Sequence, residues 1–340
     1  MTDSSVRFEE LDALRGIAAI SVVLFHYTGH ANRYFDDFPF HLKYGEFGVQ
    51  LFFVISGFVI YFTLKRSRRM MDFAFARLSR LYPAYWATLS LLLIVDLLDP
   101  ERFVWWGGFL VNATLLQRTI GYPDIDIVFW TLAVEMTFYL VISVTFFFAG
   151  LERRIWIVIG IWLACANIWP HVVHIFPSRS AEWIQSLQVF PHSPYFLAGI
   201  AFYDVRGNGL RVRHLSVLVG CWLTLWHVSG ETHAVASLLI FAAVLLAVMG
   251  RLSFIVNPVT LWLGAISYSL YLVHRNLGYM ALFELNRLGI ASAWGLLITV
   301  CGAVLLASAI TYFVERPAMG LFRLWYRRVR VADSPSAGIS

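Results

Sequence analysis

Apolar residues along this chain form long runs that recur from the N-terminus to about residue 313. Many of these runs approach ~20 residues, the length that an α-helix needs to cross the hydrocarbon core of a bilayer. Their polar and basic flanks predict ten transmembrane segments: 11–31, 45–64, 81–98, 128–149, 155–170, 188–205, 212–229, 232–250, 258–280 and 290–313. The pattern predicts an all-α, polytopic integral membrane protein with one transmembrane domain over 1–320. A basic cytoplasmic segment and a disordered tail are expected over 321–340.

The composition supports this class, since 59% of the 340 residues are hydrophobic, 14% are charged and the mean hydropathy is +0.69. Such values exclude an ordinary soluble protein. The first run is not a cleavable signal peptide, because acidic rather than basic residues precede it and no small-residue cleavage site follows. The three cysteines lie far apart inside predicted segments without metal-ligand spacing, so we interpret them as small apolar residues and expect no metal. They are Cys165, Cys221 and Cys301.

The lysines and arginines predict the orientation of the segments. If the N-terminus is cytoplasmic, the inner segments hold Arg7, Lys65, Arg66, Arg68, Arg69, Arg77, Arg80, Arg153, Arg154, Arg206, Arg211, Arg213, Arg251, Arg316, Arg323, Arg327, Arg328 and Arg330. The outer loops hold only Arg33, Lys43, Arg102, Arg118, Arg179 and Arg287. This bias follows the positive-inside rule and places both termini in the cytoplasm, with the protein in the inner (cytoplasmic) membrane. It also accounts for the isoelectric point near 9.2 without a nucleic-acid partner.

Two stretches lie outside the predicted segments. Residues 99–127 contain WWGGFLVNATLLQ, which is too short to span and is predicted to be interfacial or re-entrant, with Trp105 and Trp106 as membrane-belt aromatics. The small, polar stretch from Val331 onward predicts a disordered tail. We find no internal repeat of the kind that marks many secondary transporters.

The first segment carries an ionisable group at each end of its apolar run, in the sequence LRGIAAISVVLFH. Ten residues lie between Arg15 and His26, a step of eleven positions that on a helix puts both on one face and ~16 Å apart along the axis. A charge inside hydrocarbon costs at least ~2.5 kcal/mol, so such groups usually face a cavity or a partner. The alternative is that Arg15 reaches the headgroups and His26 is a packing histidine with one hydrogen bond.

The ninth segment contains LGAISYSLYLVH, in which Ser267, Tyr271 and His274 recur at i, i+4 and i+7 and share a face. Tyr268 lies beside that face. His274 falls in the outer half of the segment. The spacing predicts a polar face toward the interior of the bundle.

Three ionisable side chains on three different helices are expected at matched depth in the outer half of the bundle: His26, Glu135 and His274. Their matched depth predicts a shared, lined cavity. A glutamate beside a histidine is a general-base arrangement in which the carboxylate orients and stabilises the imidazolium. The alternative is a buried hydrogen-bonded cluster that joins helices.

Arginines also mark the inner side, where KRSRRMMDFAFARLSRLYPAYW leads into the third segment. Arg77 and Arg80 are three residues apart and share a helix face at the entrance to that segment. Guanidinium groups bind phosphate well, which predicts a phosphorylated cytoplasmic ligand. Arg15 enters from the same side, so it would hold the inner portion of the ligand while His26 meets the reactive end.

These motifs resemble, in order and spacing, the membrane-bound acyltransferase-3 family. The residues that carry the resemblance are Arg15 with His26, GVQLFFVISGF (48–58), RLSRLYPAYW (77–86), FWTLAVE (129–135) and SYSLYLVH (267–274). It extends over residues 8–317, including the ERP of Glu315 to Pro317. Members move an acyl group, commonly acetyl, from cytoplasmic acyl-CoA to hydroxyls of sugars and related acceptors at or beyond the membrane.

The resemblance implies roles for individual residues. His26 would be the catalytic histidine, Arg15 would belong to the same motif, and Glu135 would assist. Arg77 and Arg80 would help hold the donor. The cavity lining would be Ser56, Ser267, Tyr268, Tyr271 and His274. Acyl-CoA would be a co-substrate, with no permanently bound cofactor. The expected partners are membrane lipids, a carbohydrate or glycolipid acceptor and polysaccharide-biosynthesis proteins.

Two departures from the family pattern matter. Members often carry an acid in the second-segment motif where this chain has Gln50, so a role that relies on a negative charge there does not carry over. Some members also carry an extracytoplasmic hydrolase-like domain that receives the acyl group. This chain ends soon after its last segment, so we expect it to acylate its acceptor itself or to use a separate partner.

Other function classes stay open at this point. A proton-coupled transporter would use His26, Glu135 and His274 as a relay, although the inner arginine pair and the lack of repeats argue against it. A membrane scaffold or sensor would give no reason for the alignment of Arg15 with His26. The outer loops do not identify the acceptor, which is an exported polysaccharide, a lipopolysaccharide, a lipo-oligosaccharide or a small hydrophobic natural product.

Overall fold

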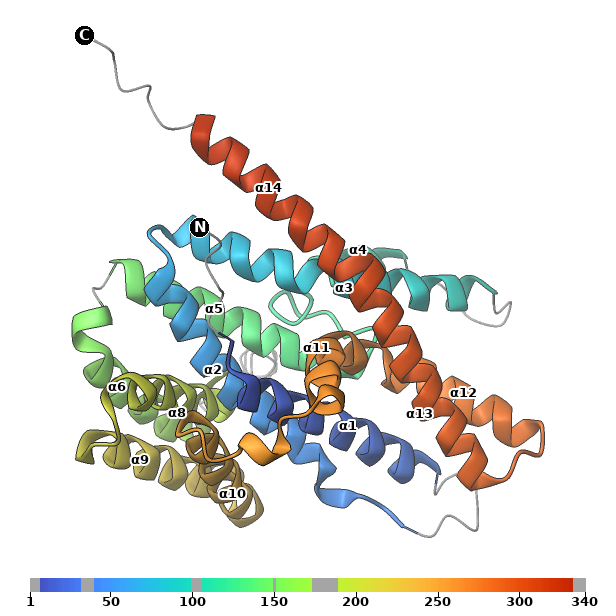
Figure 1. The fold of residues 1–340 in the computed structure, drawn as a ribbon, viewed down its shortest axis with the longest axis horizontal. Helices are drawn as coiled ribbons and strands as arrows, with labels where there is room; N and C mark the ends of the chain where they lie inside the picture. The colour runs from blue at the N-terminus through green and yellow to red at the C-terminus, as the bar shows by residue number, and fades with distance from the viewer. Residues whose placement is uncertain (1–6, 32–39, 99–105, 149–150, 173–188, 333–340) are drawn as a thin grey trace.

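The computed structural model describes residues 7–31, 40–98, 106–148, 151–172 and 189–332 (Figure 1). Across these ranges the regular elements are helices, which confirms the all-α prediction. They are α1 (Glu9–Ala31), α2 (Gly48–Arg66), α3 (Met70–Leu98), α4 (Trp106–Asn112), α5 (Trp130–Phe148), α6 (Leu151–Val172), α8 (Val189–Asn208), α9 (Val212–Ser229), α10 (Glu231–Val248), α11 (Pro258–Val273), α12 (Arg275–Arg287), α13 (Ser292–Ala309) and α14 (Arg316–Ala332). A π-helical turn, Ile310–Glu315, joins α13 to α14.

Each predicted segment coincides with a helix, and seven helices of the described part are long and apolar enough to cross a membrane. They cover Glu9–Ala31, Lys43–Arg66, Met70–Leu98, Ile127–Phe148, Arg154–Val172, Glu231–Val248 and Ser292–Tyr326. The apolar α11 has 16 residues and is shorter than a full span. The multi-pass class is therefore confirmed, while the number of ten crossings stays a prediction.

Three boundaries differ from the prediction. Helix α3 begins at Met70 rather than at 81, because its polar first turns are helical and Asp72 accepts hydrogen bonds from the backbone N–H groups of Arg68 and Arg69. The segment 258–280 is divided between α11 and α12 at His274. The last segment continues into α14, which includes Val331, the expected start of the tail. Hydropathy marks the apolar part of a helix and not the polar turns that extend it.

In the stretch predicted to be interfacial or re-entrant, the described residues from Trp106 onward form the short helix α4 and a series of turns that are hydrogen-bonded to α3. Three α3 side chains donate to backbone carbonyls there: Tyr82 to Thr114, Tyr85 to Asn112 and Trp86 to Ala113. The buried amide of Asn112 also donates to Gly108 O and Pro123 O. Trp106 is exposed, and Trp105 lies outside the described residues.

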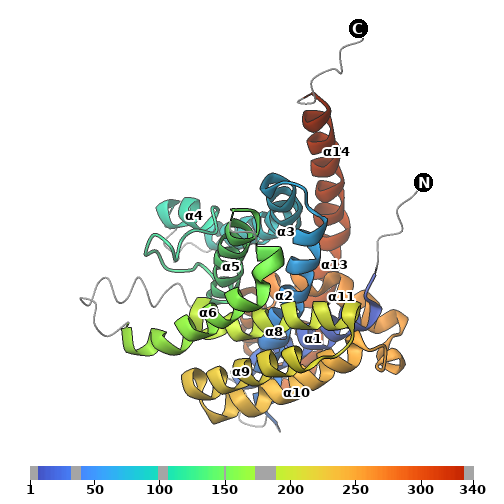
Figure 2. The same cartoon turned by 90° about the vertical axis from the view of Figure 1, so that its left-hand side faces the viewer.

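Two helix pairs cross with their backbones in contact at the centre of the fold. A Cβ on Gly264 of α11 would overlap the carbonyl oxygen of Asp12 on α1, and a Cβ on Gly199 of α8 would overlap that of Val54 on α2. Small residues allow this close approach, which is the usual basis of helix packing in membranes. In Figures 1 and 2, α1, α2 and α11 lie between the pair α9 and α10 on one side and the pair α3 and α4 on the other.

The bundle has two chemically distinct ends, which we name by α1. The arginine end is where α1 begins, near Arg15, and the histidine end is where α1 finishes, beyond His26. Helix α14 extends away from the bundle at the arginine end, in line with α13 and alongside the start of α3 (Figures 1 and 2).

Candidate functional site

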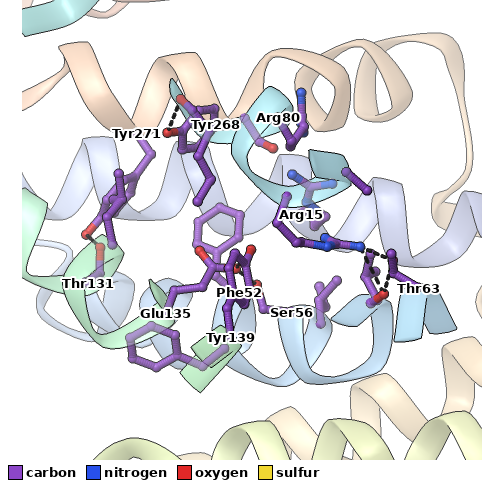
Figure 3. Close-up of a pocket in the computed structure, with 18 of the residues that line it drawn as sticks. Arg15, Phe52, Ser56, Thr63, Arg80, Thr131, Glu135, Tyr139, Tyr268 and Tyr271 are labelled. Atoms are coloured by element: carbon purple, nitrogen blue, oxygen red, sulfur yellow. Dashed lines mark hydrogen bonds between the residues drawn. The ribbon is translucent and has the colours of Figure 1, made fainter. Parts of the chain in front are cut away.

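An elongated cavity of about 360 Å³ lies among α1, α2, α3, α5, α11 and α14 (Figure 3). Its lining on α2 runs from Val49 to Thr63, which corresponds to ~21 Å along a helix axis. In Figure 3, Arg15 and Thr63 lie toward one end of the cavity, and Thr131 and Tyr271 lie at the other. The cavity therefore extends from the arginine end into the middle of the bundle.

All of the site residues predicted from the sequence line this cavity except the two histidines. The residues that it brings together are Arg15, Ser56, Arg77, Arg80, Glu135, Ser267, Tyr268 and Tyr271. Thr63, Tyr139, Met319 and Arg323 join them, and none of these four was predicted. Gln50 is buried on α2 outside the lining.

Arg80 is paired with the carboxylate of Glu315, a contact that was not predicted from the sequence. Its guanidinium forms an ion pair with the fully buried Glu315, whose Oε2 also accepts a 3.0 Å hydrogen bond from Ser269. Thr311 donates to Ser269 in turn, so the π-helical turn and α11 together hold the acid. The only sequence signal for this pair is the ERP motif, which does not reveal its partner on α3. Arg80 is thus largely neutralised by Glu315.

The other arginines of the cavity have no carboxylate partner among the described residues. Arg77 donates to Thr63 Oγ1 and to the backbone oxygen of Val59, 3.2 Å away. Arg15 and Arg323 form no hydrogen bond or ion pair within the described part of the chain. Because these three guanidinium groups face one cavity, that cavity attracts anions.

Glu135 supplies the carboxylate of the cavity and does not contact His26. Its Oε1 accepts 2.7 Å hydrogen bonds from Ser56 Oγ and from the Tyr139 hydroxyl. The sequence predicts the depth of Glu135 along α5, but not the rotation that turns its side chain toward α2. The expected pairing of Glu135 with His26 is therefore not what the structure shows.

His26 contacts α12 and His274 instead. Its Nδ1 lies 3.1 Å from the hydroxyl of Tyr279, and its ring centroid lies 5.1 Å from that of His274. The Tyr279 ring stacks on His30 at 3.6 Å. Tyr279 was not predicted as a site residue, because the polar face read from 258–280 ends at His274. Helix α12 begins at Arg275, directly after α11, and packs on α1 with Tyr279 beside His26.

His274 is fully buried and has a defined tautomer. Its Nδ1 lies 2.7 Å from the backbone oxygen of Tyr271, which can only accept, so Nδ1 carries the proton. Its Nε2 is buried and has no hydrogen-bond partner in the described residues. The Tyr271 ring lines the deep end of the cavity and lies 5.6 Å from the His274 ring. The deep end of the cavity is thus one side chain away from the histidine pair.

A buried acid supports this corner from the loop before α5. Asp126 accepts 3.2 Å hydrogen bonds from the backbone N–H groups of Val128 and Asn276, and its Oδ1 lies 3.6 Å from Arg275. Burial raises the pKa of the Asp126 carboxyl, and these contacts oppose the rise. Arg275 lies over the Tyr279 ring at 5.1 Å. Asp126 therefore ties the start of α12 to α5.

The described residues contain no group of three or more histidines, cysteines or acids that could hold a metal ion.

Comparison with known proteins places this geometry in a family context. The sequence model of the family described as "Acyltransferase domain" matches residues 8–313. The chain is 25% identical to Acyltransferase MdmB of Streptomyces mycarofaciens, with 97% of this chain and 95% of that protein covered. It is 25% identical to Nodulation protein 10 of Rhizobium leguminosarum bv. viciae (97% and 98% covered) and 26% identical to Exopolysaccharide production protein ExoZ of Rhizobium meliloti (82% and 91%). No solved structure matches the chain significantly.

Proposed function

Because the chain belongs to the family whose acyltransferase domain covers residues 8–313, we propose that it moves an acyl group from cytoplasmic acyl-CoA to a hydroxyl of a cell-surface or exported carbohydrate. The reaction class follows from the family and from its acyltransferase-named relative. We propose in addition the identity of the donor, the class of the acceptor and the direction of transfer, with acetyl as the favoured acyl group.

The observation that carries the donor is the arginine-rich cavity. Arg15, Arg77 and Arg323 face it without a carboxylate partner, and CoA carries a diphosphate and a 3′-phosphate that such groups bind. The positive-inside bias puts the arginine end in the cytoplasm, where CoA is available. The depth of the cavity along α2 accommodates the long pantetheine arm, with the thioester directed toward Tyr271.

We assign the chemical step to His26. As a general base, its imidazole takes the proton of the acceptor hydroxyl while the hydroxyl oxygen attacks the thioester carbonyl. The carbon–sulfur bond then breaks, and the CoA thiolate takes the proton from the imidazolium to leave as a thiol. The other route, transient acylation of His26, uses the same residue.

Tyr279 replaces Glu135 as the residue that positions His26 in this proposal. If His26 Nδ1–H donates to the Tyr279 oxygen, Nε2 carries the lone pair and is the basic nitrogen. Glu135 instead holds Ser56 and Tyr139 in the cavity wall.

The relatives support a carbohydrate acceptor. One of them is named for exopolysaccharide production and another for nodulation. At 25–26% identity the chain does not inherit their individual substrates, so a lipo-oligosaccharide or a small natural product is the second choice.

The test uses the purified protein in lipid nanodiscs with radiolabelled acetyl-CoA and a panel of cell-surface glycans. We expect release of free CoA that depends on the acceptor, with label transferred to a glycan hydroxyl. A protein that releases no CoA with any acceptor, but accumulates a solute in response to a proton gradient in proteoliposomes, would instead be a transporter.

A further inference from the structure

Helix α14 supplies part of the cavity wall although it lies beyond the part of the chain that the family domain covers, which ends at residue 313. Met319 and Arg323 of α14 line the same cavity as Arg15 and Arg77. The sequence places Arg323 in a basic segment outside the transmembrane domain. The structure makes it a wall of the site.

Contacts on both sides of Arg323 fix its position. Before it, Glu315 pairs with Arg80 of α3. After it, the Tyr326 hydroxyl donates a 2.7 Å hydrogen bond to Asp72 Oδ1, and the Tyr326 ring stacks on Phe75 at 4.2 Å. Asp72 also accepts hydrogen bonds from the backbone N–H groups just before α3. This one carboxylate therefore joins α14 to the start of α3. Arg323 is therefore presented by an anchored helix rather than by a free tail.

Arg323 differs from Arg77 and Arg80 in lacking a partner, and from the equally unpaired but half-buried Arg15 in its exposure. Arg80 is neutralised by Glu315, and Arg77 is committed to the oxygens of Thr63 and Val59. Arg323 is exposed at the rim and has no hydrogen bond or ion pair to any described residue. It retains its whole donor capacity for a ligand that enters at the arginine end.

We propose that Arg323 binds the 3′-phosphate of the CoA donor. This inference rests on the proposed function. If the acyl end of the donor points toward Tyr271 and His26, the adenosine end stays at the rim. The 3′-phosphate is on that end, far from the thioester. A guanidinium there recognises a phosphate by a charge-assisted, bidentate contact and contributes to binding without touching the reacting atoms.

The test compares acetyl-CoA with 3′-dephospho-acetyl-CoA, in wild type, Arg323→Ala and Arg323→Lys. The matched control is Arg328→Ala, which removes an exposed arginine of the same helix that does not line the cavity. We expect Arg323→Ala to raise KM for acetyl-CoA about tenfold with kcat unchanged, as for the loss of one charged hydrogen-bonded contact. The KM for 3′-dephospho-acetyl-CoA should not change in Arg323→Ala. Arg323→Lys should recover part of the wild-type preference for acetyl-CoA over the dephospho donor.

The outcomes separate the inference from the proposed function. If wild type uses both donors and Arg323→Ala keeps the wild-type ratio of the two KM values, the inference is overturned and the function stands. The inference is also overturned if Arg323→Ala raises KM equally for both donors, or if Arg328→Ala raises KM for acetyl-CoA as much as Arg323→Ala does. Wild type that turns over neither donor and shows no CoA binding by calorimetry contradicts the proposed function itself. Circular dichroism and elution volume check that each variant is folded.

Discussion

The Tyr279 hydroxyl and His26 Nδ1 lie 3.1 Å apart, although 253 positions separate the two residues in the chain. Two features of α12 produce this contact. Helix α12 starts at Arg275, directly after α11, and Gly278 lets α12 approach Tyr27, whose ring would overlap a Cβ at that position. Tyr27 also donates a 2.7 Å hydrogen bond to the His274 carbonyl. The pairing is therefore built by the packing of α12 on α1.

Replacement of Tyr279 by Phe tests this contact. The variant keeps the ring that stacks on His30 and loses only the hydroxyl, so a cost of about 1–1.5 kcal/mol, or roughly tenfold in kcat, is expected. KM for acyl-CoA should stay unchanged because the donor cavity is elsewhere. The matched control is Tyr195→Phe, which removes another tyrosine–histidine contact, 3.4 Å to His233, outside the site. Equal kinetics for the two variants would contradict a positioning role.

The ion pair of Arg80 with Glu315 predicts a strong effect on stability. Glu315→Gln leaves a guanidinium with a side-chain exposure of 26% without its counter-charge, which we expect to cost about 2–3 kcal/mol and to lower Tm by several degrees. Thermal unfolding in detergent measures this effect. Glu284→Gln is the control, because it breaks an exposed pair with Arg287 that is worth no more than about 0.5 kcal/mol. Equal Tm values for the two variants would show that the Arg80–Glu315 ion pair does not stabilise the fold.

The crossing of α2 with α8 makes a second stability prediction. Gly199→Ala introduces a Cβ against the backbone of Val54, so the helices must separate, at a cost of about 2 kcal/mol or more. Gly160→Ala on α6 is the control, because no atom lies within 4 Å of its Cβ and alanine favours a helix. Urea or thermal unfolding followed by tryptophan fluorescence should therefore show that Gly199→Ala is less stable than wild type, and that Gly160→Ala is as stable as wild type or slightly more stable. The opposite ranking would rule out the close crossing.

The sequence predicts the helical class, the approximate position of each helix and the family, because apolar runs and motif spacing are local properties. It also predicts most of the polar side chains of the cavity lining, such as Arg15, Arg77, Glu135 and Tyr271. It does not predict which of these groups contact each other. The rotation of α5 directs Glu135 toward Ser56, and the packing of α12 on α1 brings Tyr279 to His26. Both depend on packing between distant segments.

The orientation of the bundle is a prediction that labelling can check. The bias of lysine and arginine places Arg69, at the arginine end, in the cytoplasm and Arg118 on the outer side. Single cysteines at these positions in a cysteine-free background should react differently with a membrane-impermeant maleimide added to whole spheroplasts. Only the cysteine at position 118 should be labelled before lysis. Labelling of both positions, or of neither, contradicts the topology and the entry of the donor from the cytoplasm.

The role of His26 in acyl transfer is tested by measuring acceptor-dependent release of CoA by purified His26→Ala. The loss of a general base lowers the rate about 10²–10⁴-fold, so we expect transfer near background. The variant should still bind CoA with wild-type affinity through the arginine end of the cavity. His227→Ala, an exposed histidine of α9, should retain full activity. A folded His26→Ala protein that transfers acyl groups at a rate close to that of wild type would show that His26 is not the catalytic base or nucleophile.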